Sequence, residues 1–96
     1  MSAFDPNKSK AKAREALLKL AQSYEGKKGM SQHAIEVYKE AIVADPDSKE
    51  ADEARDGLMK IAQKFEKEGK RESAFHIYRK LSRELPRPAL KHPVKY

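Results

Sequence analysis

The 96-residue chain contains no cysteine and no tryptophan. Without cysteine it can form neither a disulfide framework nor a thiolate site for a metal or for redox chemistry. Its three histidines, His33, His76 and His92, are not spaced three or four residues from one another, so local spacing builds no metal cage. A glycine-rich phosphate loop and a nucleophile elbow are also missing from the sequence. These absences predict a protein that is not an enzyme and holds no cofactor or metal.

Long hydrophobic runs are absent as well. No segment approaches the length of a membrane span, and residues 1–7 lack the apolar core of a secretion signal. We therefore expect a cytoplasmic protein without a membrane segment. Hydrophobic residues make up 39% of the chain and charged residues 38%, which predicts one domain with a thin core under a charged surface.

The net charge of +6 is concentrated at the two ends of the chain. Residues 1–14 contain four bases and one acid, residues 87–96 contain three bases, and residues 15–86 balance fourteen bases with fourteen acids. Because residues 15–86 carry no net charge, they do not predict a basic face that binds a phosphate backbone. No aromatic residue lies among the bases between Lys8 and Arg14. Weak, salt-sensitive nucleic-acid association through the basic termini is kept as the alternative function.

Two stretches of the chain nearly repeat each other. Residues 17–25 align with residues 58–66 at an offset of 41, and residues 34–38 align with residues 74–78 at an offset of 40. The apolar positions in both stretches recur at steps of three and four, which is typical of amphipathic helices. The sequence therefore predicts two similar pairs of helices, with one extra residue in the first turn.

Local signals predict where these helices begin and end. The first helix is expected from Asp5-Pro6 to about Glu25, with the second starting at a capping Ser31 and stopping before residues 45–46. The third is expected over residues 48–67, with Asp47 and Glu50 as a capping box, and the fourth extends to about residue 85.

Two glycines bear on the third helix. Gly69 is expected to end it. Gly57 lies inside it, at a typical cost of ~1 kcal/mol against alanine. Gly57 is either a tolerated surface residue or a point of close contact with another helix or a partner.

The repeated positions resemble the 34-residue signature of the tetratricopeptide repeat, which alternates large apolar, small and aromatic residues before a final proline. In the second copy they are Leu58, Ile61, Ala62, Phe65, Ala74, Tyr78, Leu81 and Pro86. In the first copy they are Leu17, Leu20, Ala21, Tyr24, Ala34, Tyr38, Ala41 and Pro46. The resemblance implies an all-α fold, in which two antiparallel helix-turn-helix hairpins stack as a short α-solenoid.

This resemblance also implies how the chain is divided. A basic N-terminal extension of the first helix occupies residues 1–14, and the first repeat occupies residues 15–47. The second repeat, with an elongated first helix, occupies residues 48–86. A basic, proline-rich tail occupies residues 87–96.

Membership of this family would make the chain a non-catalytic protein-interaction module, or a small scaffold or accessory subunit of a larger complex. In the family the first helix of each hairpin lines a concave face. The matching positions here are Glu15, Leu18, Lys19, Gln22, Asp56, Met59, Lys60 and Gln63. Among them, the predicted partner contacts are Leu18, Lys19, Gln22, Met59, Lys60 and Gln63. Lysine, amide and apolar side chains at equivalent positions of the two helices would suit a peptide that carries some acidic residues. Alternatively, these are ordinary exposed polar residues.

The tail and the ends of the repeats supply two more predicted surfaces. The tail is expected to lie on an acidic partner surface through Arg87, Leu90, Lys91, Val94 and Tyr96; the alternative is a tail with no binding role.

Because solenoids normally need about three repeats, we also expect a homodimer, or burial of the same surface in a heteromeric complex. That surface comprises Ala51, Ala54, Phe75, Leu81 and Leu85. Folding back of the tail through its apolar residues is the alternative cover.

Overall fold

A computed structural model gives the structure of the chain and describes residues 6–87, with side chains from Lys8 onward. All regular structure in this range is helical. The elements are α1 (Pro6–Glu25), α2 (Ser31–Ala44), α3 (Lys49–Lys67), α4 (Arg71–Arg79) and the π-helical segment η1 (Lys80–Glu84) that continues α4. The predicted all-α fold is confirmed.

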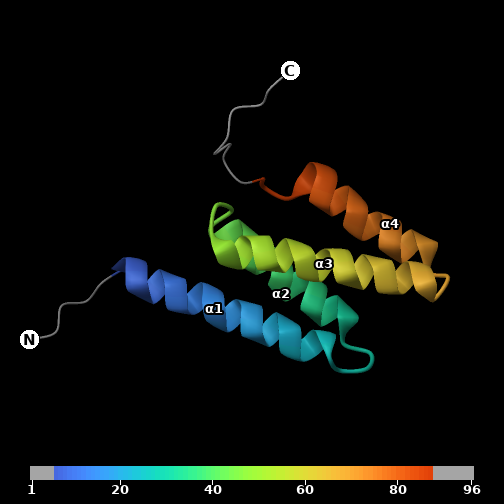
Figure 1. Cartoon of the computed structure of the whole chain (residues 1–96), viewed down its shortest axis with the longest axis horizontal. Coiled ribbons are helices and arrows are strands. Elements are labelled where there is room, and N and C mark those ends of the chain that lie inside the picture. Colours follow the sequence, from blue (N-terminus) through green and yellow to red (C-terminus); the bar gives the residue numbers. More distant parts are fainter. Residues whose placement is uncertain (1–5, 88–96) are drawn as a thin grey trace, which may run out of the picture.

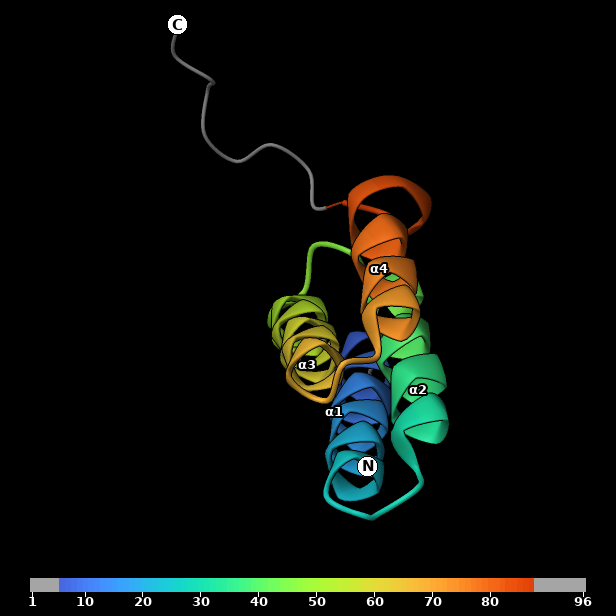
Figure 2. The same cartoon turned by 90° about the vertical axis from the view of Figure 1, so that its right-hand side faces the viewer.

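The helices form two hairpins stacked on each other. Consecutive helices run in opposite directions, and α1 and α4 lie at opposite ends of the stack (Figures 1 and 2). Each helix packs against the next along the chain, and α1 also packs against α3. The arrangement is the short helical solenoid that the sequence predicts.

Turn chemistry sets the ends of α3. Ser48 is its N-cap, because the Ser48 Oγ accepts a hydrogen bond from the Ala51 N–H at 3.1 Å. At the other end Gly69 has φ +79°, and the Lys70 N–H donates to the Phe65 carbonyl at 2.8 Å, which is the pattern of a Schellman cap. Gly69 ends the helix as predicted.

Two predicted caps are wrong. The cap of α3 is Ser48 instead of Asp47, and the Glu50 carboxylate faces Arg14 of α1 at 3.2 Å instead of returning to the cap. Ser31 is the first residue of α2 and not its cap, since Met30 occupies the cap position and makes no side-chain bond. In both cases the helix begins one residue away from the position that the capping signal indicated.

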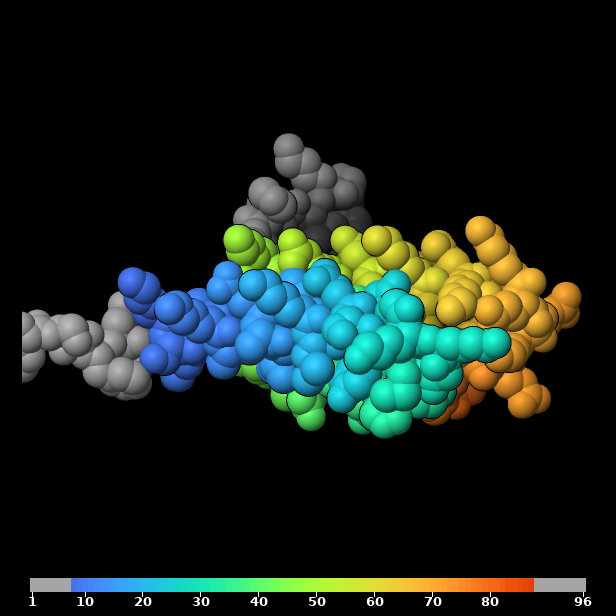
Figure 3. Space-filling model, turned by 90° about the horizontal axis from the view of Figure 1, so that it is seen from below, coloured from blue at the N-terminus to red at the C-terminus, as the bar shows by residue number. Residues whose placement is uncertain are grey.

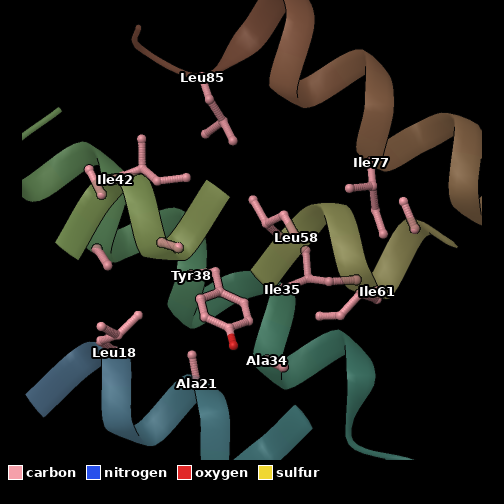
Figure 4. Close-up of a cluster of buried hydrophobic side chains, with 14 of the residues drawn as sticks. Leu18, Ala21, Ala34, Ile35, Tyr38, Ile42, Leu58, Ile61, Ile77 and Leu85 are labelled. Carbon is pink, nitrogen blue, oxygen red and sulfur yellow. The ribbon is translucent and has the colours of Figure 1, made fainter. Parts of the chain in front are cut away.

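The core runs through both hairpins and centres on Tyr38, whose ring lies between α1 and α3 with its hydroxyl pointing toward α1 (Figure 4). The four small residues of the repeat belong to this core, and each is almost fully buried: Ala21, Ala34, Ala62 and Ala74. A Cβ atom at Gly57 of α3 would lie 2.3 Å from the Cζ atom of Tyr38. Gly57 therefore permits close contact with another helix, and the interpretation as a tolerated surface glycine is wrong.

The first helix buries a different stripe from the one that the repeat predicts. Leu20 is 44% exposed, Leu17 and Tyr24 are half-buried, and Leu18 is 7% exposed. The reason is position: α1 begins the stack and forms one of its outer surfaces (Figure 3), whereas α3 is packed between α2 and α4. Leu17, Leu20 and Tyr24 of α1 are equivalent to the buried stripe of α3, but no helix of the described residues covers their outer side.

Candidate partner-binding surfaces

A cleft of about 470 Å³ opens between α1 and α3. Both helices are the first of their hairpins, so this is where the sequence predicted a concave binding face. Its lining residues come from three helices and the first turn: Gln22, Glu25, Gly26, Tyr38, Glu53, Asp56, Gly57 and Lys60. The cleft is mainly polar and open to solvent.

Tyr38 of α2 lines the cleft and contacts α1. The Tyr38 hydroxyl donates a hydrogen bond to the Glu25 carboxylate, which ties α2 to the end of α1. The pKa of Tyr38 is raised above its ordinary value, chiefly by burial of the ring and to a lesser extent by this hydrogen bond. Gly57 lets the ring reach this position, because any side chain at that point of α3 would collide with it.

Acidic groups outnumber basic ones in the lining. Glu25, Glu53 and Asp56 contribute three carboxylates, and Lys60 contributes the single ammonium group. Glu25 also accepts the Tyr38 hydroxyl, which leaves Glu53 and Asp56 for an incoming group. The cleft can therefore accept hydrogen-bond donors and positive charge.

The predicted groove residues separate into three groups. Gln22 and Lys60 line the cleft, as does Asp56, which was placed on the same face. Lys19 and Gln63 are exposed but lie outside the lining. The remaining two residues lie elsewhere in the molecule.

Leu18 and Met59 do not lie where the prediction placed them. Leu18 is buried in the core, so the prediction that it offers apolar contact in the groove is wrong. Met59, which is 40% exposed, lines a hollow with α4 residues instead. Glu25 and Glu53 line the cleft although the sequence pattern did not single them out. Their spacing of three from Gln22 and Asp56 places each on the same helical face and could have identified them.

A second candidate surface, the α4 outer face, consists of Met59, Phe75, Tyr78, Arg79 and Leu81. Hollows of about 630 and 570 Å³ flank it, and both are lined by Phe75, Tyr78 and Arg79. Phe75 is 59% exposed, and the Arg79 guanidinium carbon lies 4.9 Å from the centroid of its ring. This cation–π contact leaves a large aromatic surface open to solvent.

The predicted oligomer surface is mostly internal. Ala51 and Ala54 are fully buried in the core that joins the helices, so their assignment to a free surface is wrong. The reason is that the start of α3 packs against α1 and α2 of the same chain. Leu85 is also buried and Leu81 is packed against the core, so Phe75 alone of this set is strongly exposed. The predicted homodimer stays a prediction.

The predicted tail contacts fall almost entirely outside the described residues. Leu90, Lys91, Val94 and Tyr96 belong to residues 88–96, about which the structure gives no description. Arg87 is described, and its guanidinium donates to the Ser82 carbonyl. The docking arm, and nucleic-acid association through the termini, stay sequence-based predictions.

Two arginines that the sequence pattern did not single out connect the hairpins. Arg14 of α1 pairs with the buried Glu50 of α3 at 3.2 Å. Arg55 donates to the carbonyls of Pro46 at 2.8 Å and Pro86 at 3.1 Å, the prolines that close the two repeats. Both arginines fix how the second hairpin sits on the first.

Within residues 6–87, no group of three or more potential metal-binding side chains converges. No helix of this part of the chain is long and apolar enough to cross a membrane. His33 contacts the Tyr24 ring at a centroid distance of 5.3 Å, and His76 lines the hollow beside Phe75. Neither histidine belongs to a ligand set.

The family model of the tetratricopeptide repeat matches residues 15–48. This segment covers most of α1, all of α2 and the turn that leads to the Ser48 cap of α3. No curated protein and no solved structure matches the chain. The match coincides with the first hairpin, and the second hairpin repeats its sequence pattern.

Proposed function

We propose that the chain is a non-catalytic protein-interaction module that works as a small accessory subunit of a larger complex, because residues 15–48 match the family model of the tetratricopeptide repeat. The observation that supports this is the cleft between α1 and α3, which joins the first helices of the two hairpins. An extended segment of a partner protein would lie in this cleft.

The lining of the cleft indicates the chemistry of the segment. Glu53 and Asp56 offer two carboxylates to a lysine or arginine side chain, and Gln22 offers both a donor and an acceptor to a peptide group. Lys60 would donate to one acidic or carbonyl group beside them. A mainly basic segment therefore fits the cleft better than the acidic peptide that the sequence alone predicted.

Affinity purification with a matched pair of variants tests this function. The tagged full chain, its Glu53→Lys/Asp56→Lys variant and a Glu40→Lys control would be purified from the native cells at low salt. Glu40 is exposed on α2 and does not line the cleft, so the control reverses a carboxylate elsewhere. We expect a partner that the unaltered chain and the control retain and that the cleft variant loses.

Circular dichroism would first confirm that both variants keep their helical content. If no protein is enriched over the tag alone, the interaction function is wrong. If the same partner is retained equally by the cleft variant, the function stands but the cleft is not the site.

A further inference from the structure

Each hairpin presents the same side to the next position in the stack, but within residues 6–87 only the first hairpin has this side covered. The corresponding residues occupy equivalent positions of the repeat: Leu18 and Met59, Ile35 and Phe75, Tyr38 and Tyr78. In the first hairpin all three are buried, with exposed fractions of 7%, 4% and 1%. In the second, Phe75 is 59% exposed, Met59 is 40% exposed and Tyr78 is half-buried. The α4 outer face is thus the second copy of a surface that is buried in the first.

Ile77 of α4 lies beside Ile35 in the first copy, but the main cover of this copy is α3. This helix packs on α2 through a stripe of apolar residues at spacings of three and four: Leu58, Ile61 and Phe65. All three are buried in the core cluster that they share with Ile35 and Tyr38. A helix with the same stripe would fit the equivalent surface on α4.

The charge of the α4 outer face indicates what kind of helix would bind there. The hollows that flank the α4 outer face are lined by Arg71, Arg79 and Arg83, against the carboxylates of Glu66 and Glu72. Glu66 also accepts the Tyr78 hydroxyl, so the open charge of the surface is mainly positive. A partner with acidic groups would complement it.

The template helix has its acidic groups at the matching end. The first half of α3 carries Glu50, Asp52, Glu53 and Asp56. Because α3 follows α2 after a short turn and runs antiparallel to it (Figure 1), this half lies beside the C-terminal half of α2. A helix docked in the same way on α4 would bring its N-terminal half to Arg79 and Arg83.

A second copy of the chain meets this requirement poorly. It would offer α1, which has the matching apolar residues Leu17 and Leu20 half-buried or exposed. The N-terminal half of α1 is basic, however, with exposed Lys10 and Lys12 where α3 carries acidic residues. Like charges would then face each other across the contact, which opposes stacking of copies.

We propose that the α4 outer face binds an amphipathic helix of another protein, with apolar residues at positions i, i+3 and i+7 and an acidic N-terminal half. This helix would take the place that the first helix of a third repeat has in a longer solenoid. The surface lies on the α3–α4 hairpin, away from the α1–α3 cleft, so the proposal does not depend on occupation of that cleft.

The chain itself supplies a probe for this surface. A labelled synthetic peptide with the sequence of residues 48–67 carries the apolar stripe and the acidic first half, and it would be titrated into the full-length protein. A peptide of residues 7–26 carries the basic equivalent. We expect saturable binding of the first peptide with changes in the amide NMR signals of residues 71–83, and at least about tenfold weaker binding of the second.

Two exposed apolar residues give matched variants. Phe75→Ala should weaken binding of the 48–67 peptide by at least about tenfold, as expected for an aromatic anchor. Val43→Ala should leave binding unchanged, because Val43 is equally exposed at 59% but lies outside the face. Arg79→Glu tests the charge and should also weaken binding, even if Phe75→Ala fails to fold.

Four results would overturn the proposal. The first is no saturable binding of the 48–67 peptide up to about 1 mM, where the binding free energy is only about −4 kcal/mol. The second is unchanged affinity in Phe75→Ala, or in Arg79→Glu. The third is equally tight binding of the basic 7–26 peptide. The fourth is self-association of the chain in light scattering that Phe75→Ala abolishes, because the occupant would then be a second copy.

Discussion

The two hairpins contain the same tyrosine–glutamate hydrogen bond in two different surroundings. Tyr38 of α2 donates to Glu25 of α1, and Tyr78 of α4 donates to Glu66 of α3. The four residues occupy equivalent positions of the repeat. Tyr38 is almost completely buried because α3 covers it, whereas Tyr78 is half-buried and no third hairpin follows it among residues 6–87. A hairpin therefore makes this bond by itself, and stacking decides whether the bond is buried.

The pKa values of the two tyrosines reflect this difference. Both are raised, but the first cause for Tyr38 is burial, whereas the first cause for Tyr78 is the hydrogen bond to Glu66. The local contact is thus common to both hairpins, and the change in surroundings comes from the neighbouring hairpin. The same reasoning predicts unequal costs for equal substitutions at equivalent positions.

The largest expected difference concerns Ile61 of α3 and its equivalent, Leu20 of α1. Ile61 is 2% exposed, and Ile61→Ala should lower the free energy of unfolding by about 2–5 kcal/mol through lost burial and the cavity left behind. Leu20→Ala should cost less than about 1 kcal/mol because Leu20 is already partly in water. Urea denaturation followed by circular dichroism measures both values. Equal losses would show that α1 is covered in solution.

Gly57 tests the close approach of α2 and α3 directly. Gly57→Ala should lower the free energy of unfolding by about 1–3 kcal/mol, because overpacking against the Tyr38 ring outweighs the better helix propensity of alanine. Gly26→Ala is the control, since a Cβ atom there would meet only ordinary contacts at 3.7 Å. A Gly57→Ala variant as stable as the control would mean that the ring moves aside easily.

Much of this architecture could be predicted from the sequence because it depends on local patterns. The helix spans, the cap at Gly69 and the buried alanines all follow from spacing and turn chemistry within one repeat. Gly57 illustrates the limit: its cost was visible in the sequence, but the reason, a ring from another helix, depends on how the hairpins stack.

The errors concern residues whose burial is set by their place in the stack. Leu18 and Met59 are equivalent in the repeat, but α1 packs against α3 and α3 has no third helix of its kind beside it within the described residues. Ala51 and Ala54 extend the stripe of α3 beyond the repeat, and the surface that covers them comes from the first hairpin. Repeat signatures describe an internal unit, so they cannot indicate which units lie at an end.

The ion pair between the hairpins gives the third prediction. Arg14→Ala leaves the buried Glu50 carboxylate without its 3.2 Å partner, which should cost about 1–3 kcal/mol of unfolding free energy. Lys39→Ala removes an exposed pair with Glu36 within α2 and should cost no more than about 0.5 kcal/mol. Thermal unfolding of both variants at low salt measures the difference. The same small change in both would show that Arg14 does not hold the hairpins together.

The smallest expected effect concerns the two tyrosines. Tyr38→Phe removes a buried hydroxyl and its bond to Glu25, and should cost about 1 kcal/mol of unfolding free energy near neutral pH. Tyr78→Phe removes the equivalent bond where water can replace it, so its loss should be smaller. Urea denaturation of the two variants against the unaltered chain makes the comparison, and equal losses would contradict the role of α3 as a cover.

The pH dependence of stability provides a second measure of the same pair. Burial raises the pKa of Tyr38 above its ordinary value of 10.0, so the folded state favours the protonated hydroxyl. The contribution of Tyr38 is then fully present below about pH 10 and is lost as the pH rises above that value. Above about pH 10, the free energy of unfolding should fall more steeply with rising pH for the unaltered chain than for Tyr38→Phe. Both proteins contain the same lysines, so lysine titration cancels in the comparison, and identical slopes would show that the folded state does not restrain ionisation of Tyr38.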